Sequence, residues 1–293
     1  MELKKSDRVR NPTQPSWGLG VVLDFSGSNK AKIRFRSGGE KVVDLRYVSL
    51  EVVTGPDAED PFLDLPDRPA RKPRLTAKSF DSLVEGFLRL FPGGFLDPSY
   101  IDQERNYKVA AHRQVLDQLS EESLRHLLAG GYVAEVKARA MKAVDATNLV
   151  FPNEKIRLKD GLKSDEIAER FARGLFDLLY GGGPMSYRFE RYADALHQGD
   201  AAKWTIATYF LFFRFPSEQM FLKPVVTQNA ADLCGFDLAY RPELNWRTYE
   251  RLLAFSQNLK ERLVSLKPRD MIDVQSFIWV TGGDYQSKRG SNT

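Results

Sequence analysis

Cysteine and histidine are scarce in this chain of 293 residues. The single cysteine, Cys234, excludes an internal disulfide and a cluster of thiolate metal ligands. The three histidines, His112, His126 and His197, lack the three- or four-residue spacing of paired metal ligands. The G-x-S-x-G elbow and the Cys–His nucleophile signature are also missing. We therefore expect no metal and no cofactor, and the sequence favours a protein that is not an enzyme.

Long hydrophobic runs are lacking as well. The longest one covers residues 206–213, with Thr208 inside it, and is far too short to span a bilayer. The N-terminal segment MELKKSDRVRNP has no apolar stretch behind its lysines, which a signal peptide would have. These absences predict a soluble cytoplasmic protein without a membrane partner.

Charge is unevenly distributed along the chain. Hydrophobic residues make up 42% and charged residues 28%, as in ordinary globular proteins. Residues 1–50 hold ten basic and five acidic residues, while the net charge of the whole chain is +4, so residues 51–293 carry a charge of −1. A basic N-terminal sixth favours an anionic partner, commonly nucleic acid, although a solvated surface has the same composition.

The first 55 residues predict a small all-β barrel of the SH3-like kind. Short alternating stretches separated by NPTQPSWGLG, SGSN and SGGE predict five strands. The alternation in KAKIRFR (residues 30–36) places Ala31, Ile33 and Phe35 inward. The four basic residues of this segment then share one outer face.

This basic face is the candidate binding surface for nucleic acid or for a protein. Basic side chains follow a phosphate backbone and an aromatic ring stacks on a base. The candidate residues are Arg8, Arg10, Trp17, Lys30, Lys32, Arg34 and Arg36. The alternative is a solvated sheet face, with Trp17 in the barrel core.

The same segment resembles a known type of domain. SDRVRNPTQPSWGLGVVLDFSGSNKAKIRFRSGGEKVV is similar to small Tudor/KOW-like barrels with the pattern G-D-R-V-x-H-P-x-(F/W)-G-x-G-x-V. These barrels occur as the C-terminal tail of UvrD-type repair helicases and as a bacterial domain of unknown function. The matching residues are Asp7, Arg8, Val9, Pro12, Trp17, Gly18, Gly20 and Val22, whereas Ser6 and Asn11 depart from the pattern. In the helicases the barrel contacts RNA polymerase or nucleic acid, so the resemblance implies docking.

The rest of the chain predicts a mainly α-helical domain, which makes the fold class α+β. Residues 56–75 are predicted to form a proline-rich linker, in which PFLDLP could instead form a strap across a neighbouring surface. Residues 283–293 are predicted to form a disordered tail. Residues 76–282 show helical periodicity. Helices are predicted at 79–90, 102–119, 121–129, 132–147, 163–180, 187–197, 204–213, 227–234 and 248–263, and 271–280 is ambiguous. Glu104 and Lys108 stand at a helical spacing that predicts an exposed, salt-bridged face.

The stretch from residue 204 to 280 holds a cluster of polar residues among apolar ones. A lysine desolvated in FLKP, Lys223, would act as a nucleophile or base. Asp270 and Asp273 share one face if they are helical and would serve acid–base chemistry. The alternative is a purely structural cluster in which the ammonium pairs with one of these aspartates.

The helical body also resembles other proteins. Through ERNYKVAAH, NLVFPNEK, WTIATYFLFF, MFLKPVVTQNAA and PRDMIDVQSFIWV it is similar to bacterial proteins of unknown function. A more distant resemblance is to helical DNA glycosylases, with Lys223 and Asp273 as counterparts of pocket residues, although the L-P-G-[IV]-G signature is absent.

Two hypotheses follow from the sequence. In the first, the chain is an accessory factor that docks through its barrel onto nucleic acid or a nucleic-acid machine such as RNA polymerase, while the helical domain binds a second partner or ligand. In the second, it is a DNA-acting enzyme of repair or phage defence, which uses Lys223 with Asp270 or Asp273.

Overall fold

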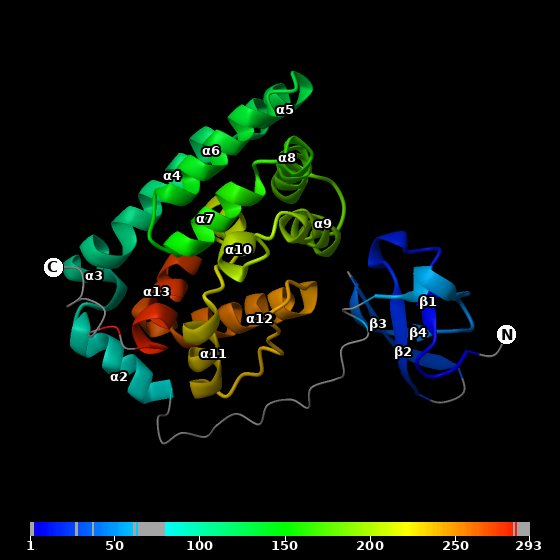
Figure 1. Cartoon of the computed structure of the whole chain (residues 1–293). Helices are drawn as coiled ribbons and strands as arrows, with labels where there is room; N and C mark the ends of the chain where they lie inside the picture. The colour runs from blue at the N-terminus through cyan, green and yellow to red at the C-terminus, as the bar shows by residue number, and fades with distance from the viewer. Residues whose placement is uncertain are drawn as a thin grey trace.

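The computed structural model describes residues 3–26, 29–36, 38–60, 63, 80–283 and 285. It confirms the predicted α+β class, with a small β domain followed by a larger α-helical domain (Figure 1). Most of the predicted linker and most of the predicted tail lie outside the described residues.

The β domain is one antiparallel sheet with the order β4-β3-β2-β1-β5. Its strands are β1 (Arg8–Arg10), β2 (Gly20–Phe25), β3 (Lys30–Phe35), β4 (Gly39–Asp44) and β5 (Glu51–Val53). Two 3-10 helices accompany them, η1 (Pro15–Trp17) and η2 (Gly55–Ala58). Ala31, Ile33 and Phe35 are fully buried, as the alternation predicts. Trp17 packs on the core, with 5.1 Å between its ring centroid and that of Phe35.

The segment after β5 returns to the β domain. Leu63 is buried in a cluster with Leu19 and Val21. The Asp60 carboxylate is buried too and accepts the backbone N–H of Leu63 at 3.3 Å. These two residues of the predicted linker, called the strap below, therefore pack against the β domain; Leu63 is the part of PFLDLP that the structure describes.

Twelve α-helices are described in the helical domain, together with two 3-10 turns, η3 (Gly94–Leu96) and η5 (Val264–Leu266), and one π-helical turn, η4 (Ile101–Arg105). The α-helices are α2 (Phe80–Leu90), α3 (Pro98–Tyr100), α4 (Asn106–Gln118), α5 (Glu121–Ala129), α6 (Val133–Asp145), α7 (Pro152–Gly161), α8 (Asp165–Tyr180), α9 (Met185–Gln198), α10 (Trp204–Arg214), α11 (Pro224–Leu233), α12 (Trp246–Arg262) and α13 (Met271–Thr281). None of the described helices combines the length and the apolar character that crossing a membrane requires.

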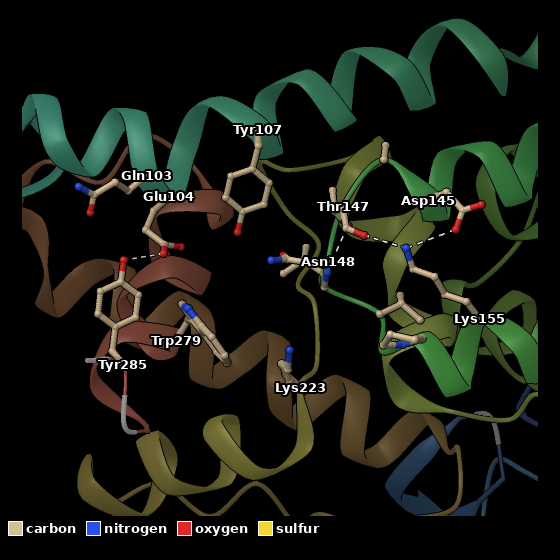
Figure 2. A pocket seen from close by; sticks show the side chains of 14 residues that line it. Gln103, Glu104, Tyr107, Asp145, Thr147, Asn148, Lys155, Lys223, Trp279 and Tyr285 are labelled. Carbon is tan, nitrogen blue, oxygen red and sulfur yellow. Dashed lines mark hydrogen bonds and ion pairs between the residues drawn. The ribbon is translucent and has the colours of Figure 1, made fainter. Parts of the chain in front are cut away.

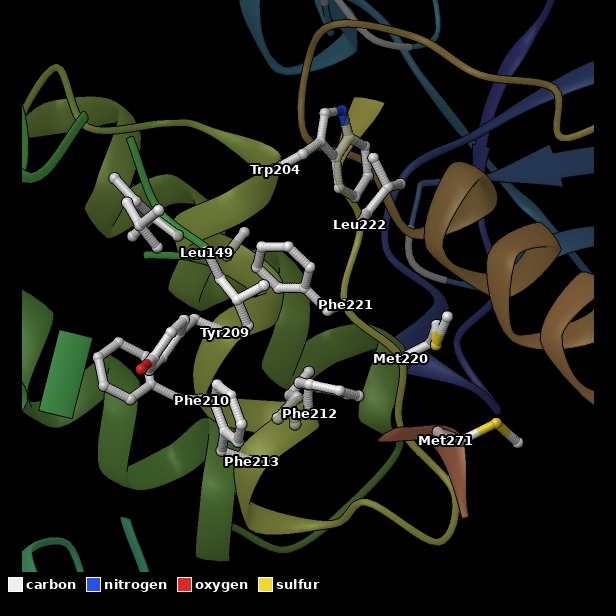
Figure 3. Packing of buried hydrophobic residues seen from close by; sticks show 14 of the residues in the cluster. Leu149, Trp204, Tyr209, Phe210, Phe212, Phe213, Met220, Phe221, Leu222 and Met271 are labelled. Atoms are coloured by element: carbon white, nitrogen blue, oxygen red, sulfur yellow. The ribbon is translucent and has the colours of Figure 1, made fainter. Parts of the chain in front are cut away.

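Helix α10 lies at the centre of the core of this domain (Figure 3). Every residue from Trp204 to Phe213 is buried, as expected for a helix that is apolar on all sides. The Thr208 hydroxyl donates to the carbonyl of Trp204 at 2.7 Å and accepts the N–H of Leu222 at 2.9 Å. The chain after α10 is thereby fixed against the helix, and it leads directly to Lys223.

Candidate functional site

A pocket of about 880 Å³ lies where four distant segments of the helical domain meet (Figure 2). These segments are η4 with the start of α4, the connection from α6 to α7, the residue before α11, and the end of α13 with Tyr285. Its lining combines three aromatic residues with charged, polar and aliphatic ones.

Lys223 points into this pocket (Figure 2). It precedes Pro224, which starts α11, and its ammonium lies 4.3 Å from the ring centroid of Phe151 and 4.7 Å from that of Trp279. Two aromatic faces stabilise a cation by attraction to the ring quadrupole. The predicted apolar surroundings of Lys223 are thus provided by rings from two other elements.

The inner end of the pocket carries a buried ion pair. Glu104 is 5% exposed, and its carboxylate accepts from the Lys108 ammonium at 3.1 Å and from the Tyr285 hydroxyl at 2.8 Å. Lys108 is completely buried and also donates to the Ser276 hydroxyl at 2.7 Å. Burial lowers the pKa of Lys108, and the charge of Glu104 only partly offsets this effect. The prediction of an exposed face here was wrong, because α13 covers this side of α4.

Glu104 belongs to the π-helical turn η4, an arrangement frequent at functional sites. Beside it, the Tyr107 side chain projects toward the middle of the pocket, as does that of Asn148 (Figure 2). Burial raises the pKa of Tyr107, with a smaller contribution from the charge of Glu104, so its phenol stays protonated at neutral pH.

The other end of the pocket is open to solvent. The Asp145 side chain is 61% exposed and lies 3.3 Å from the ammonium of Lys155. That ammonium also donates to the carbonyl of Thr147 at 2.9 Å. The ion pair and its bond to the backbone hold the mouth of the pocket in place.

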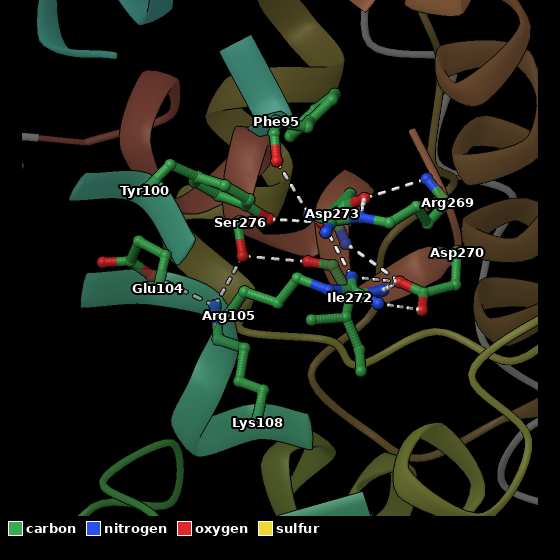
Figure 4. Close-up of polar contacts among 10 residues, drawn as sticks. All are labelled: Phe95, Tyr100, Glu104, Arg105, Lys108, Arg269, Asp270, Ile272, Asp273 and Ser276. Atoms are coloured by element: carbon green, nitrogen blue, oxygen red, sulfur yellow. Dashed lines mark hydrogen bonds and ion pairs between the residues drawn. The ribbon is translucent and has the colours of Figure 1, made fainter. Parts of the chain in front are cut away.

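The two candidate aspartates lie elsewhere, at the N-terminus of α13 (Figure 4). Arg105 binds both of them, with 2.7 Å from Nη2 to Oδ2 of Asp270 and 2.8 Å from Nη1 to Oδ1 of Asp273. Asp270 caps the helix by accepting the N–H of Ile272 at 3.0 Å. The two carboxylates therefore share one helix end, and α13 resolves the ambiguous segment as a helix.

Asp273 is completely buried and has several donors. Arg269 donates through Nε at 2.9 Å, and the Tyr100 hydroxyl donates at 2.6 Å. Burial raises the pKa of Asp273, but the hydrogen bonds from Arg269 and Tyr100 and the charge of Arg105 outweigh it and hold this pKa below its ordinary value.

The three catalytic candidates do not line one pocket. Lys223 lines the pocket beside Trp279, whereas Asp270 and Asp273 are outside its lining. Trp279 follows Asp273 by six residues, roughly 9 Å along a helix axis, which separates the two sites.

The candidate binding face of the β domain is divided between solvent and the helical domain. Arg10, Lys30 and Lys32 are exposed, and Lys32 pairs with Glu40 at 2.9 Å. Arg34, by contrast, is only 5% exposed and lies 3.0 Å from the same carboxylate. The outward alternation of β3 is present, but its second half faces the helical domain.

Arg36 joins the two domains. Its guanidinium lies 3.1 Å from Asp60, 2.9 Å from Asp194 of α9 and 3.8 Å from Glu190 of the same helix. Burial raises the pKa of Glu190 to about 7, and the negative charges of Asp194 and Asp60 contribute to this increase. No local sequence pattern predicts this contact, because Arg36 and Asp194 are 158 residues apart.

The remaining predicted residues of the β domain have local roles. Arg8 donates from Nε to the carbonyl of Ala58 at 3.2 Å. Trp17 is half-buried in the core contact with Phe35, and the Lys41 ammonium lies 5.9 Å from its ring centroid. Trp17 therefore packs against the core of the β domain as a partly buried residue, which is closer to the alternative interpretation of the sequence than to an exposed stacking ring.

No cluster of three or more potential metal ligands (His, Cys, Asp or Glu) occurs in the part of the chain that the structure describes. No match to the chain is found among curated proteins or among solved structures. Residues 3–53, which include all five strands, match the family described as "Protein of unknown function (DUF3553)". The chain thus carries, at its N-terminus, a domain of this family of unknown function.

Proposed function

We propose that this chain is a non-enzymatic accessory factor with two binding parts. The helical domain binds a small polar ligand in the pocket beside Lys223, and the β domain docks onto a protein of a nucleic-acid machine. The pocket is the observation that carries this proposal.

The size and lining of the pocket support ligand binding. Ligand sites typically enclose roughly 300–1,000 Å³ and combine aromatic walls with a few polar groups. At about 880 Å³, with Tyr107 and Trp279 in its wall and Lys223 directed inward, this pocket has both properties.

The exposed side of the β3–β4 hairpin supports docking onto a protein. Val42 is 61% exposed and pairs across the sheet with Lys32, and Tyr47, just after β4, is 80% exposed. The Arg46 guanidinium lies 5.3 Å from the ring centroid of Tyr47. Tyrosine and arginine are enriched in protein interfaces.

Charge pairing within the chain favours a protein over a nucleic-acid backbone as partner. Glu40 neutralises Lys32 and Arg34, and Arg36 is occupied by acids of both domains. A surface that follows phosphates needs basic groups that can replace counterions. The resemblance to barrels of repair helicases makes an RNA-polymerase-like protein the first partner to test.

The enzyme hypothesis has less support from the geometry. The aspartates assigned to it, Asp270 and Asp273, are bound by Arg105, and Asp273 also by Arg269. Lys223 lines a pocket that lacks both carboxylates.

Native mass spectrometry tests the pocket. The full-length protein is incubated with a low-molecular-mass cell extract, desalted and weighed, and an adduct is expected. Asn148→Trp, at the exposed part of the lining, should abolish the adduct, whereas Asn153→Trp, on the exposed surface of α7, should keep it. Absence of any adduct, or an adduct that persists in Asn148→Trp, contradicts the proposal.

Biolayer interferometry tests the docking. Purified bacterial RNA polymerase is expected to bind the full-length protein, and Tyr47→Ala combined with Val42→Asp should weaken binding at least about tenfold. Lys5→Ala, an exposed change outside this hairpin, is the matched control. Salt-sensitive binding to duplex DNA with no binding to the polymerase would reverse the choice of partner.

A further inference from the structure

We propose that the pocket binds a nucleoside monophosphate group whose base carries an exocyclic amine, with the base against Glu104 and the phosphate at Lys223. This inference rests on the proposed ligand-binding function of the helical domain. It names the chemical class of the ligand.

The inner end of the pocket is built to accept a hydrogen bond from a neutral donor. The Glu104 carboxylate holds two donors, from Lys108 and Tyr285. An ionised carboxylate offers about four acceptor positions, so it retains capacity for a donor on a ligand. Its charge is already balanced by the buried ammonium of Lys108, which disfavours a cationic ligand and favours an amine conjugated to a ring.

The walls next to Glu104 suit a planar ring. Tyr107 and Trp279 project from α4 and α13 on opposite sides of the space in front of this carboxylate (Figure 2). Stacking of a base on an aromatic side chain contributes about 1–3 kcal/mol. An aliphatic amine would fill less of this space and would lack such stacking.

The middle of the pocket suits an anion. The Lys223 ammonium is directed inward while it lies over two rings, and an ammonium has three donor hydrogens. The N-terminus of α11, a helix of ten residues, begins directly after Lys223 and adds positive potential. The Asn148 side-chain amide lies opposite and supplies another donor (Figure 2).

Two sources present this chemistry, a free mononucleotide and the 5′-phosphorylated end of a single strand. The mouth at Asp145 is exposed, so it admits either one. The order of groups from Glu104 to Lys223 to the mouth places the base inside and the phosphate outside in both cases.

Isothermal titration calorimetry with the full-length protein tests this assignment. AMP should bind at least about tenfold more tightly than adenosine, which lacks the phosphate, and than IMP, which lacks the amine. Lys223→Met should remove the preference for AMP over adenosine, and Glu104→Gln should remove the preference for AMP over IMP. Lys159→Met, on the exposed surface of α7, should change neither ratio.

The oligonucleotide arm separates the two sources. A short single strand with a 5′-phosphate that binds more tightly than AMP, and more tightly than the same strand with a 5′-hydroxyl, identifies a strand end; the reverse order identifies a free nucleotide. If no nucleotide and no strand binds while the extract adduct persists, the nucleotide assignment is overturned and ligand binding stands. If the adduct is missing too, both proposals fail. Circular dichroism identifies a Glu104 variant that does not fold, and the Lys223 variant then decides.

Discussion

Buried charged side chains in the helical domain have partners of opposite charge and further hydrogen-bond partners. These partners determine how much each charged side chain contributes to stability. Asp273 has two arginines and a tyrosine hydroxyl as partners, and Lys108 has a glutamate and a serine. Removing one member of such a group leaves an uncompensated charge in a medium that solvates it poorly. Lys223 differs in being only partly buried: its ammonium lies over two aromatic rings and is directed into a pocket.

Asp273→Asn should therefore destabilise the protein far more than Lys223→Ala. The aspartate change leaves the charges of Arg105 and Arg269 without their shared carboxylate and should lower the free energy of unfolding by about 3–5 kcal/mol. The lysine change removes cation–π contacts and should lower it by about 1 kcal/mol. Urea denaturation followed by circular dichroism measures both, and equal losses would contradict the division between a structural cluster and a binding site.

Glu190 should make stability depend on pH. Its pKa of about 7 in the folded protein, compared with an ordinary value of 4.5, means that the folded state holds this proton over a range in which the unfolded state has lost it. The free energy of unfolding should therefore fall as pH rises from about 4.5 to 7, by on the order of 3 kcal/mol.

Glu190→Gln removes this titration. The free energy of unfolding of the variant, measured relative to that of the wild type, should therefore be higher above about pH 7 than near pH 4.5. Urea denaturation at both pH values measures the change, and Glu169→Gln, on the exposed face of α8, is the control. A difference from the wild type that is the same at both pH values would show that Glu190 does not hold the proton.

At the scale of elements, periodicity predicted the helices and strands because those patterns depend on neighbours in sequence. The alternation in β3 placed Ala31, Ile33 and Phe35 correctly. Helix α7 was missed as a full helix, because its apolar residues are few and Pro152 suggested a break. Proline is tolerated in the first turn of a helix, where its missing N–H has no intrahelical partner.

Local sequence patterns could not predict the pocket or the contact between the two domains. Glu104 and Lys108 are four residues apart, yet their burial depends on Ser276, 168 residues after Lys108. The direction of Lys223 depends likewise on Phe151 and Trp279, which come from two other elements. Spacing along one helix indicates which side chains share a face, but not what covers that face.

Close packing of α7 against the end of α9 provides a test at this scale. A Cβ added at Gly161 would lie 1.9 Å from the carbonyl oxygen of Gly199, whereas one at Gly182 would meet nothing within 4 Å. Gly161→Ala should therefore lower the free energy of unfolding by about 1–3 kcal/mol through forced backbone shifts. Gly182→Ala should be neutral or slightly stabilising, by up to about 1 kcal/mol. Thermal denaturation of the two variants measures this, and similar melting temperatures would contradict the packing argument.

In the molecule as a whole, several ion pairs link the two domains. Arg36 reaches Asp194 of α9, and Arg247 of α12 reaches Glu40 of β4 at 3.3 Å. Partly exposed ion pairs are individually weak and are screened by salt. The relative position of the domains should therefore respond to charge changes that leave each domain folded.

Arg36→Ala should loosen this contact and increase the radius of gyration in small-angle X-ray scattering. About 1 M salt, with a Debye length of roughly 3 Å, should shift the wild type in the same direction. Lys30→Ala, an exposed change at the start of β3, the strand that Arg36 directly follows, should have no effect. A radius that stays constant in Arg36→Ala and at high salt would mean that other contacts fix the domains.

The strap at Asp60 and Leu63 decides where the β domain can be excised. The family match stops at residue 53, but a polypeptide cut there would uncover Leu19 and Val21 and deprive Arg36 of a buried carboxylate. Newly uncovered apolar groups of this kind promote self-association in solution. A recombinant fragment intended for crystallisation or for fusion to a reporter should therefore extend beyond Leu63, ten residues past the limit that sequence similarity alone would set.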